Sequence, residues 1–344
     1  MKRLLVLVTL LFSFSFFNIL GIRPQLLPQH FIFFFLSLAA FFLVRRAGFR
    51  FFYENTHVWY AVFIGLLVVT YVIGFEARGS RRWIDFGLFN FQPSEFFKVF
   101  YALYFAKFLT DNARILDEWP VIIKMTLFAA IPVLIVFLQP DLGSSLVYLV
   151  MFTTLILLSA TPRRLIWRMY APAALLAPLG WFFLKDYQRA RLVSFMDPAV
   201  DMLGSGYNVL QAKITAGSGG FFGKGLGYGT QTKLFFLPEN HTDFAYASLV
   251  EQFGFIGGAI IICVYALLFI HLLRRALEWG RATDKVAHTK SLFGIAFVAA
   301  IAFQAVINIG MNLGIFPVTG ITLPFISYGG SSFLSLFVGL ALLL

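Results

Sequence analysis

Long apolar stretches, separated by short polar or Gly/Pro-containing breaks, recur along the whole chain of 344 residues. Each stretch approaches the roughly 20 residues that a helix needs to cross a bilayer. The pattern predicts about ten transmembrane helices, over residues 4–20, 29–44, 56–75, 94–110, 119–138, 143–160, 166–184, 243–273, 286–310 and 329–344. The expected fold class is therefore all-α, a polytopic membrane protein.

The composition agrees with this interpretation, because 60% of the residues are hydrophobic and only 12% are charged. A soluble domain carries about 25% charged residues. The opening MKRLLVLVTLLFSFSFFNILG has the basic start of a signal peptide, which is the alternative interpretation. Its apolar run is longer than a signal core and no small-residue cleavage site follows, which favours a first spanning helix.

Lysines and arginines concentrate in alternate breaks, and this bias predicts the orientation. If the N-terminus is cytoplasmic, the inner segments hold fifteen of them, whereas the short outer loops hold only Arg23, Arg78, Arg81 and Arg82. Both termini are then cytoplasmic, and residues 185–242 form a large extracytoplasmic loop between the seventh and eighth helices. The net charge of +11 fits attraction to an anionic inner leaflet, so membrane lipids rather than nucleic acid are the expected partners.

Two charged residues stand at the start of the fourth apolar segment, in QPSEFFK. Pro93 suits a first helical turn, Ser94 is a candidate cap, and Glu95 lies near the positive end of the helix dipole. Glu95 and Lys98 are three residues apart, so they share a helix face and can form an ion pair. A structural pair at the membrane boundary and a functional pair are both compatible with this spacing.

Two further outer segments carry candidate anion-binding groups. GSRRWID places Arg81 and Arg82 beside Trp83, and paired arginines suit phosphate or carboxylate, although an interface-anchored loop is the favoured interpretation. GSGGFFGKGLGYG, with Lys224, holds seven glycines in thirteen residues but matches no nucleotide-binding pattern. Its backbone N–H groups suit a pyrophosphate, yet a mobile loop is the default expectation.

The eighth and ninth apolar segments add polar groups at membrane depth. Gln304, Asn308 and Asn312 recur every four residues, which favours an interhelical hydrogen-bonding seam. In LPENHTDFAYASLVEQFG, Asp243 stands where a loop becomes a helix, and Glu251 lies deeper on roughly the same face. Asp243 suits a helix cap, a general base or a cation ligand, and the spacing does not choose among them.

Together, several motifs resemble the SEDS family of cell-wall polymerases. They are GSRRWI and QPSEFFK, QPDLGSS, YQRARLVSFMDP, GYNVLQAK, GSGGFFGKGLGYGTQT, FLPENHTDF and NIGMNLGIFPVTGITLPFISYGGSS. The resemblance runs from about residue 78 to residue 332. It implies that residues 1–344 form a single SEDS-like transmembrane domain. GTQTKLFFLPE is more similar to the elongation branch (RodA) than to the division branch (FtsW). AYAS and Glu251-Gln252 depart from the family pattern after HTDF, and this leaves the role of Glu251 open.

The resemblance implies a peptidoglycan glycosyltransferase that joins lipid II units into β-1,4 glycan during cell elongation and releases undecaprenyl pyrophosphate. It implies catalytic roles for Asp243, as general base, and for Glu95 and Lys98. Other residues of the same motifs are candidates for substrate binding, namely Arg81, Arg82, Asp141, His241, Lys224 and Ser327. The enzyme is expected in the bacterial inner (cytoplasmic) membrane with its active site on the extracytoplasmic side.

The resemblance also implies partners and narrows the alternatives. A class B penicillin-binding protein is expected as transpeptidase partner within the elongation machinery, because the chain has no Ser-x-x-Lys nucleophile motif. A divalent cation (Mg²⁺ or Mn²⁺) is a candidate for stabilising the leaving pyrophosphate, and no organic cofactor is expected. A lipid II flippase or transporter, the division-type paralogue and a structural scaffold are the alternatives.

Overall fold

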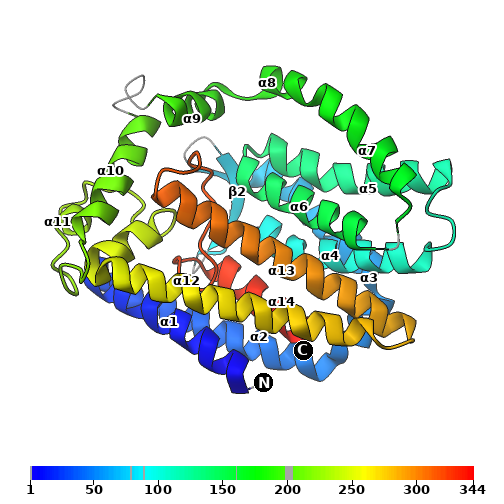
Figure 1. Ribbon diagram of the computed structural model, residues 1–344, viewed down its shortest axis with the longest axis horizontal. Coiled ribbons are helices and arrows are strands. Elements are labelled where there is room, and N and C mark those ends of the chain that lie inside the picture. The colour runs from blue at the N-terminus through cyan, green and yellow to red at the C-terminus, as the bar shows by residue number, and fades with distance from the viewer. Residues whose placement is uncertain (1, 78–79, 88–89, 160, 198–203) are drawn as a thin grey trace. The chain divides into compact units, whose positions relative to one another are not determined.

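Most apolar windows of the sequence become helices with nearly the expected bounds, although α2 and α12 extend beyond the predicted ends at residues 44 and 273. The computed structural model describes residues 2–77, 80–87, 90–159, 161–197 and 204–344 (Figure 1). The long helices are α1 (Lys2–Ile22), α2 (Leu27–Glu54), α3 (Thr56–Ile73), α4 (Pro93–Asp111), α5 (Trp119–Leu138), α6 (Leu142–Leu158), α7 (Arg163–Leu176), α12 (Ala245–Gly280), α13 (Lys285–Asn312) and α14 (Gly330–Leu343). A 3₁₀ turn, η1 (Pro24–Leu26), links the first two.

The chain divides into two compact units. The first contains Met1–Phe35, Leu184–His271 and Ala302–Phe333. The second contains Leu36–Phe183, Leu272–Ile301 and Leu334–Leu344. Asp243 therefore lies in the first unit, and Glu95 lies in the second.

Within the described residues, six helices are long and apolar enough to cross a membrane. They are α1, η1 with α2, α3, α5, α12 and α13, and α6 and α14 are shorter apolar helices. Helix α4 carries two acids and two lysines, and α7 has only 14 residues. The chain is thus a multi-pass membrane protein, whereas the full count of about ten spans and the cytoplasmic position of the termini stay predictions.

Helix α4 is largely buried within the second unit. It packs against α3 and α6, and α5 packs in turn against α6. Tyr101, Leu103 and Phe105 on α4 are fully buried, and Glu95 and Lys98 near its start are buried with less than a tenth of their surface exposed. Charged side chains on a helix that is covered all round are costly unless they are paired, so α4 is where a charge pair is expected to matter.

A small antiparallel sheet in the second unit departs from the expected all-α class. Its strands are β1 (Phe75–Ala77), β2 (Ser80–Asp85) and β3 (Asn90–Phe91), in the order β1-β2-β3. Phe75 pairs with Trp83 across β1 and β2, and their rings stack with centroids 5.9 Å apart. Such cross-strand aromatic pairs stabilise short strands, which a search for helical periodicity does not detect.

The expected seventh span and the following loop also differ from expectation. Instead of one helix over 166–184, the chain forms α7, a 3₁₀ turn η2 (Ala177–Leu179) and a single turn α8 (Gly180–Phe183). Pro178 lacks the N–H that a continuous helix needs, which explains the interruption after α7, whereas Pro172 is accommodated inside α7. Residues 185–242, expected as a loop, contain α9 (Asp186–Met196), α10 (Ser205–Ser218) and α11 (Thr230–Lys233).

Candidate active site

Hydrogen bonds from several directions hold the backbone around Asp243. The carbonyl oxygens of residues 240–243 each accept from a donor elsewhere in the first unit. The donors, in the order of the carbonyls, are Ser248 Oγ at 2.7 Å, the Tyr328 N–H at 2.8 Å, Ser327 Oγ at 2.6 Å, and the side-chain amides of Asn308 at 3.0 Å and Asn312 at 3.1 Å. Asp243 therefore projects from a rigid backbone, as a catalytic group requires.

The amides of Asn308 and Asn312 belong to the row that the sequence predicts as a hydrogen-bonding seam, and the structure confirms this for both. Asn308 Nδ2 also donates to the Ile321 carbonyl at 2.7 Å, and Asn312 Oδ1 accepts from the Ala247 N–H at 2.9 Å. Both side chains are fully buried. Helix α13 thus ties the start of α12 to the irregular segment 313–329.

The carboxylate of Asp243 is half-buried and lies beside a glycine and an arginine. A side-chain carbon at Gly320 would stand 3.7 Å from Oδ2 of Asp243 and 3.9 Å from Nη1 of Arg191. Arg191 Nη1 donates to the Val318 carbonyl at 3.4 Å, and Gly320 has a positive φ of 72°. The segment 313–329 therefore brings a guanidinium from α9 near the carboxylate that stands just before α12.

The alternative in which Asp243 caps α12 is not supported. The helix begins at Ala245, and the Ser248 N–H donates to the Phe244 carbonyl at 3.1 Å. Phe244 thus occupies the N-cap position, and Asp243 lies one residue before it. Its side chain is placed toward Gly320 and Arg191 instead.

Ser327 and His241, both candidates for substrate binding, have different surroundings. Ser327 is buried, donates to the Thr242 carbonyl at 2.6 Å and accepts from the Leu323 N–H at 2.8 Å, which favours a structural role. The half-buried ring of His241 lies 5.7 Å from that of Tyr328. Burial raises the pKa of the Tyr328 phenol to about 12, so it stays a donor at neutral pH.

The Gly-rich loop 217–229 is fastened to α12 rather than mobile, which corrects the expectation. The backbone N–H groups of Lys224 and Gly225 donate to the carbonyls of Glu251 at 2.9 Å and Gln252 at 3.0 Å. These two N–H groups are therefore engaged within the protein and do not form the pyrophosphate cradle that the glycines suggested. The loop is part of the support of α12.

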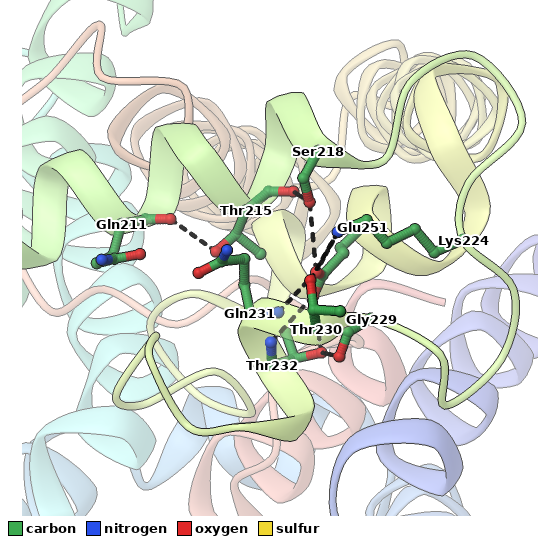
Figure 2. A network of polar contacts seen from close by, with 9 residues as sticks. All are labelled: Gln211, Thr215, Ser218, Lys224, Gly229, Thr230, Gln231, Thr232 and Glu251. Carbon is green, nitrogen blue, oxygen red and sulfur yellow. Dashed lines mark hydrogen bonds and ion pairs between the residues drawn. The ribbon is translucent and has the colours of Figure 1, made fainter.

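Lys224, another candidate for substrate binding, forms an ion pair within the protein. Its ammonium lies 3.2 Å from Oε1 of the fully buried Glu251 and 2.9 Å from Oγ1 of Thr230 (Figure 2). A lysine that balances a buried carboxylate is not readily given up to a ligand. This geometry favours a structural role for Lys224.

In the second unit, Glu95 and Lys98 form the ion pair that their spacing predicts. Lys98 Nζ donates to Glu95 Oε1 at 2.7 Å, and less than a tenth of either side chain is exposed. The Ser94 cap is wrong: the N-cap of α4 is Gln92, and Pro93 opens the helix. The carbonyl of Ser94 instead accepts from the Tyr148 hydroxyl at 2.7 Å.

Asp141 caps α6 and gathers polar groups from two other elements of the second unit. Its carboxylate accepts from the Ser144 N–H at 3.0 Å, the Ser144 hydroxyl at 2.9 Å and the Gln92 amide at 3.2 Å. Arg82 Nη1 lies 3.5 Å from Oδ2 of Asp141, which is buried. The motif QPDLG therefore has a structural explanation, and a substrate role for Asp141 stays a prediction.

The two adjacent arginines do not act as one clamp. Both lie on β2, where successive side chains point to opposite faces of the sheet. Arg82 turns toward Asp141 and stacks over the Trp83 ring at 4.3 Å, whereas Arg81 is exposed. The predicted pair is therefore split, and Arg81 has the accessible guanidinium. Arg78 lies outside the described residues.

The donor set around Asp243 does not resemble a protein metal site. Among the described residues, no group of three or more His, Cys, Asp and Glu side chains is arranged to hold a metal ion. The cationic neighbour Arg191 also disfavours a second positive charge at that carboxylate. The divalent cation stays a prediction.

The family model FTSW_RODA_SPOVE, described as "Cell cycle protein", matches residues 4–344. The chain belongs to this family. "Probable peptidoglycan glycosyltransferase FtsW" of Hydrogenovibrio crunogenus is 37% identical over 311 residues, which are 90% of this chain and 78% of that protein. "Peptidoglycan glycosyltransferase MrdB" of Escherichia coli K12 is 38% identical over 290 residues, 83% and 75%.

Solved structures agree with the family. A chain described under "Structural coordination of polymerization and crosslinking by a peptidoglycan synthase complex" matches with a TM-score of 0.81 and 30% identity, over 100% of this chain and 96% of that one. Thermus thermophilus RodA matches with a TM-score of 0.71 and 28% identity, over 99% and 94%. These matches confirm the resemblance to SEDS peptidoglycan glycosyltransferases and a RodA-like fold, while relatives from both branches share the similarity.

One residue of this site has no role assigned by the sequence. Arg191 stands in YQRARLVSF, one of the motifs that indicated the family, but nothing in that motif points to Asp243. The local signal is the density of arginines, Arg189 and Arg191, on a short helix in a segment predicted to be extracytoplasmic. The proximity of Arg191 to Asp243 depends on the segment 313–329, which comes much later in the chain.

Proposed function

We propose that this chain polymerises lipid II into β-1,4 glycan strands and releases undecaprenyl pyrophosphate, with Asp243 as general base. The observation that carries the proposal is a half-buried carboxylate on a backbone held through four consecutive carbonyls, with a guanidinium beside it. The family supplies the reaction class, since its named relatives are peptidoglycan glycosyltransferases.

The reaction needs a base because a sugar hydroxyl is a weak nucleophile. Asp243 accepts the hydroxyl proton as that oxygen attacks the anomeric carbon of the donor. The bond from this carbon to the pyrophosphate oxygen breaks, and its electron pair leaves with the pyrophosphate. The donor linkage is α and the product is β, so one displacement with inversion suffices, and no covalent enzyme intermediate is required.

Arg191 is the group best placed to stabilise the leaving charge in the first unit. A guanidinium presents a planar fork of donors that matches phosphate oxygens. Such fixed donors contribute most where water is excluded, and both Arg191 and Asp243 are half-buried. A divalent cation, if required, would arrive mainly with the pyrophosphate of the substrate, because the donor set at Asp243 does not fit one.

The test is purified protein with fluorescent lipid II, analysed for glycan length on a gel and for lipid movement in vesicles. Polymer that muramidase digests supports the proposal. Lipid movement without polymer would identify a flippase, and neither activity would leave a scaffold. Either of these last two outcomes would overturn the proposed reaction.

Arg191 gives a prediction of its own. Arg191→Lys keeps the charge but loses the fork, so polymerisation should fall by about 10-fold, and Arg191→Gln should lower it by about 100-fold. Arg189→Gln is the matched control, because Arg189 is on the same helix and makes a 3.9 Å surface pair with Asp186. Initial rates with lipid II measure the effect. Equal rates for Arg191→Gln and the control would remove Arg191 from the site.

We also propose the elongation role, in the bacterial inner membrane with the site facing outward, and a class B penicillin-binding protein as partner. The RodA-like motif GTQTKLFFLPE supports the elongation branch. The structural neighbour described as part of a peptidoglycan synthase complex supports such a partner. Complementation of elongation-deficient and division-deficient strains tests the branch, and rescue of division alone would assign the other one.

A further inference from the structure

Glu251, whose role the sequence leaves open, is the centre of a polar cluster in the first unit (Figure 2). Its side chain is fully buried. Oε1 accepts from the Gln231 N–H at 2.9 Å, Lys224 Nζ at 3.2 Å and Ser218 Oγ at 3.3 Å. Oε2 accepts from the Thr232 hydroxyl at 2.8 Å and the Thr232 N–H at 3.0 Å. Lys224 balances the charge of Glu251, and hydrogen bonds occupy both carboxylate oxygens, so this carboxylate is held rigidly.

The carboxylate joins three segments to α12. Ser218 is the last residue of α10, and Lys224 lies in the Gly-rich loop. Gln231 and Thr232 lie within α11 (Figure 2). The approach is close: a side-chain carbon at Gly229 would stand 2.5 Å from Oε2 of Glu251. A glycine is therefore required where the loop passes the carboxylate.

A second set of bonds runs from this cluster to the backbone beside Asp243. The carbonyl of Thr232 accepts from Asn240 Nδ2 at 3.2 Å, and Asn240 is fully buried. The carbonyl of Asn240 accepts from Ser248 Oγ at 2.7 Å. Both the side chain and the backbone carbonyl of Asn240 are thus hydrogen-bonded, and Asp243 follows three residues later. A displacement of Thr232 is passed to the segment 240–243.

We propose that Glu251 is a positioning residue for Asp243, acting through Thr232 and Asn240. This inference rests on the proposed function, since it assumes that Asp243 is the base. The seam on α13 holds the Asp243 carbonyl from one side, and the Glu251 cluster fixes the start of the same segment from the other. A purely structural anchor would affect stability alone, whereas a positioning residue also affects the chemical step.

Glu251→Gln replaces an acceptor oxygen by an NH₂ group that faces existing donors, so the cluster loosens without a change in size. The kcat for lipid II should fall by about 10–100-fold with KM changed by less than about twofold, as small misplacements of a catalytic group do. Asn240→Ala, which leaves the Glu251 cluster intact, should lower kcat in the same way. Because both act on one relay, the double variant should be no slower than the slower single variant.

Two controls and a second measurement complete the test. Thr230→Val removes an exposed partner of Lys224 but none of the five bonds to Glu251, and should keep wild-type kcat. Thr232→Ser keeps both donors and should also be active. Hydrogen–deuterium exchange of the folded full-length chain should rise at residues 240–244 in Glu251→Gln and not in Thr230→Val.

The outcomes separate this inference from the proposed function. If the wild-type protein makes no glycan, the proposed function fails, and the exchange data alone decide whether Glu251 fixes residues 240–244. If the wild type is active and folded Glu251→Gln keeps its kcat, the positioning role is overturned. A rise in KM at unchanged kcat, or strictly multiplicative effects of the two changes, would overturn it as well.

Discussion

Asp243→Asn is expected to abolish glycan formation while the protein stays folded. Loss of a general base costs about 10²–10⁴-fold in rate, and asparagine has no basic oxygen to take the hydroxyl proton. The fold should survive because the backbone carbonyl of Asp243, not its side chain, binds Asn308 and Asn312. Polymerisation rate and thermal unfolding of the purified variant measure the two parts of this prediction.

The same exchange at an exposed acid provides the control. Asp186 lies at the start of α9 in the same unit, and its side chain is fully exposed, so Asp186→Asn should change neither rate nor stability. A capping role for Asp243 would instead lower stability by about 0.5–2 kcal/mol and spare the chemistry. Near-normal polymerisation by folded Asp243→Asn would show that another group is the base.

The parts of this protein that the sequence predicted are those set by neighbours in the chain. The long apolar windows became helices because length and hydrophobicity are local properties. The Glu95–Lys98 pair followed from a helical spacing of three, and Asn308 and Asn312 from a spacing of four. Asp243 stood out because a carboxylate beside an apolar helix is unusual.

The parts that the sequence did not predict depend on residues far apart in the chain. Arg191 and Asp243 are brought near each other by the segment 313–329, which lies against both. Arg82 lies close to Asp141 although α4 and α5 stand between them in the chain. Its neighbour Arg81 points to the other face of β2 and therefore does not share this carboxylate. Glu251 fastens the Gly-rich loop, whose glycines indicated flexibility when no partner was in view. At Gly219, Gly223 and Gly229 the absence of a side chain allows a close approach to α12.

Proline and short strands account for the remaining differences in the fold. The seventh apolar window has the hydrophobicity of a span, but Pro178 interrupts it after α7, so η2 and α8 follow instead of a continuous helix. The strands β1, β2 and β3 have three, six and two residues. Strands this short give no clear alternation of apolar and polar residues in the sequence. Both features lie in the second unit.

Changing either Glu95 or Lys98 alone is expected to destabilise the protein, because each is the other's counter-charge in a buried site. Glu95→Gln leaves a buried ammonium without its partner, and Lys98→Met leaves a buried carboxylate. Breaking a buried pair on one side typically costs about 3–5 kcal/mol, whereas replacing both members is often nearly neutral. Each single variant should therefore unfold at a lower temperature, and the double variant should recover much of that loss.

Activity should follow a different course if the pair takes part in catalysis. Each single variant should lose more than about 10-fold in polymerisation rate, and the double variant should remain impaired although its combined loss is smaller than the product of the two. Glu278→Gln is the control: Arg275 and Glu278 have the same spacing and a 2.8 Å contact, but they are exposed, and surface pairs contribute about 0–1 kcal/mol. If the double variant regains wild-type rate with its stability, the pair is structural. If the two losses simply multiply, Glu95 and Lys98 act independently and the shared role is wrong.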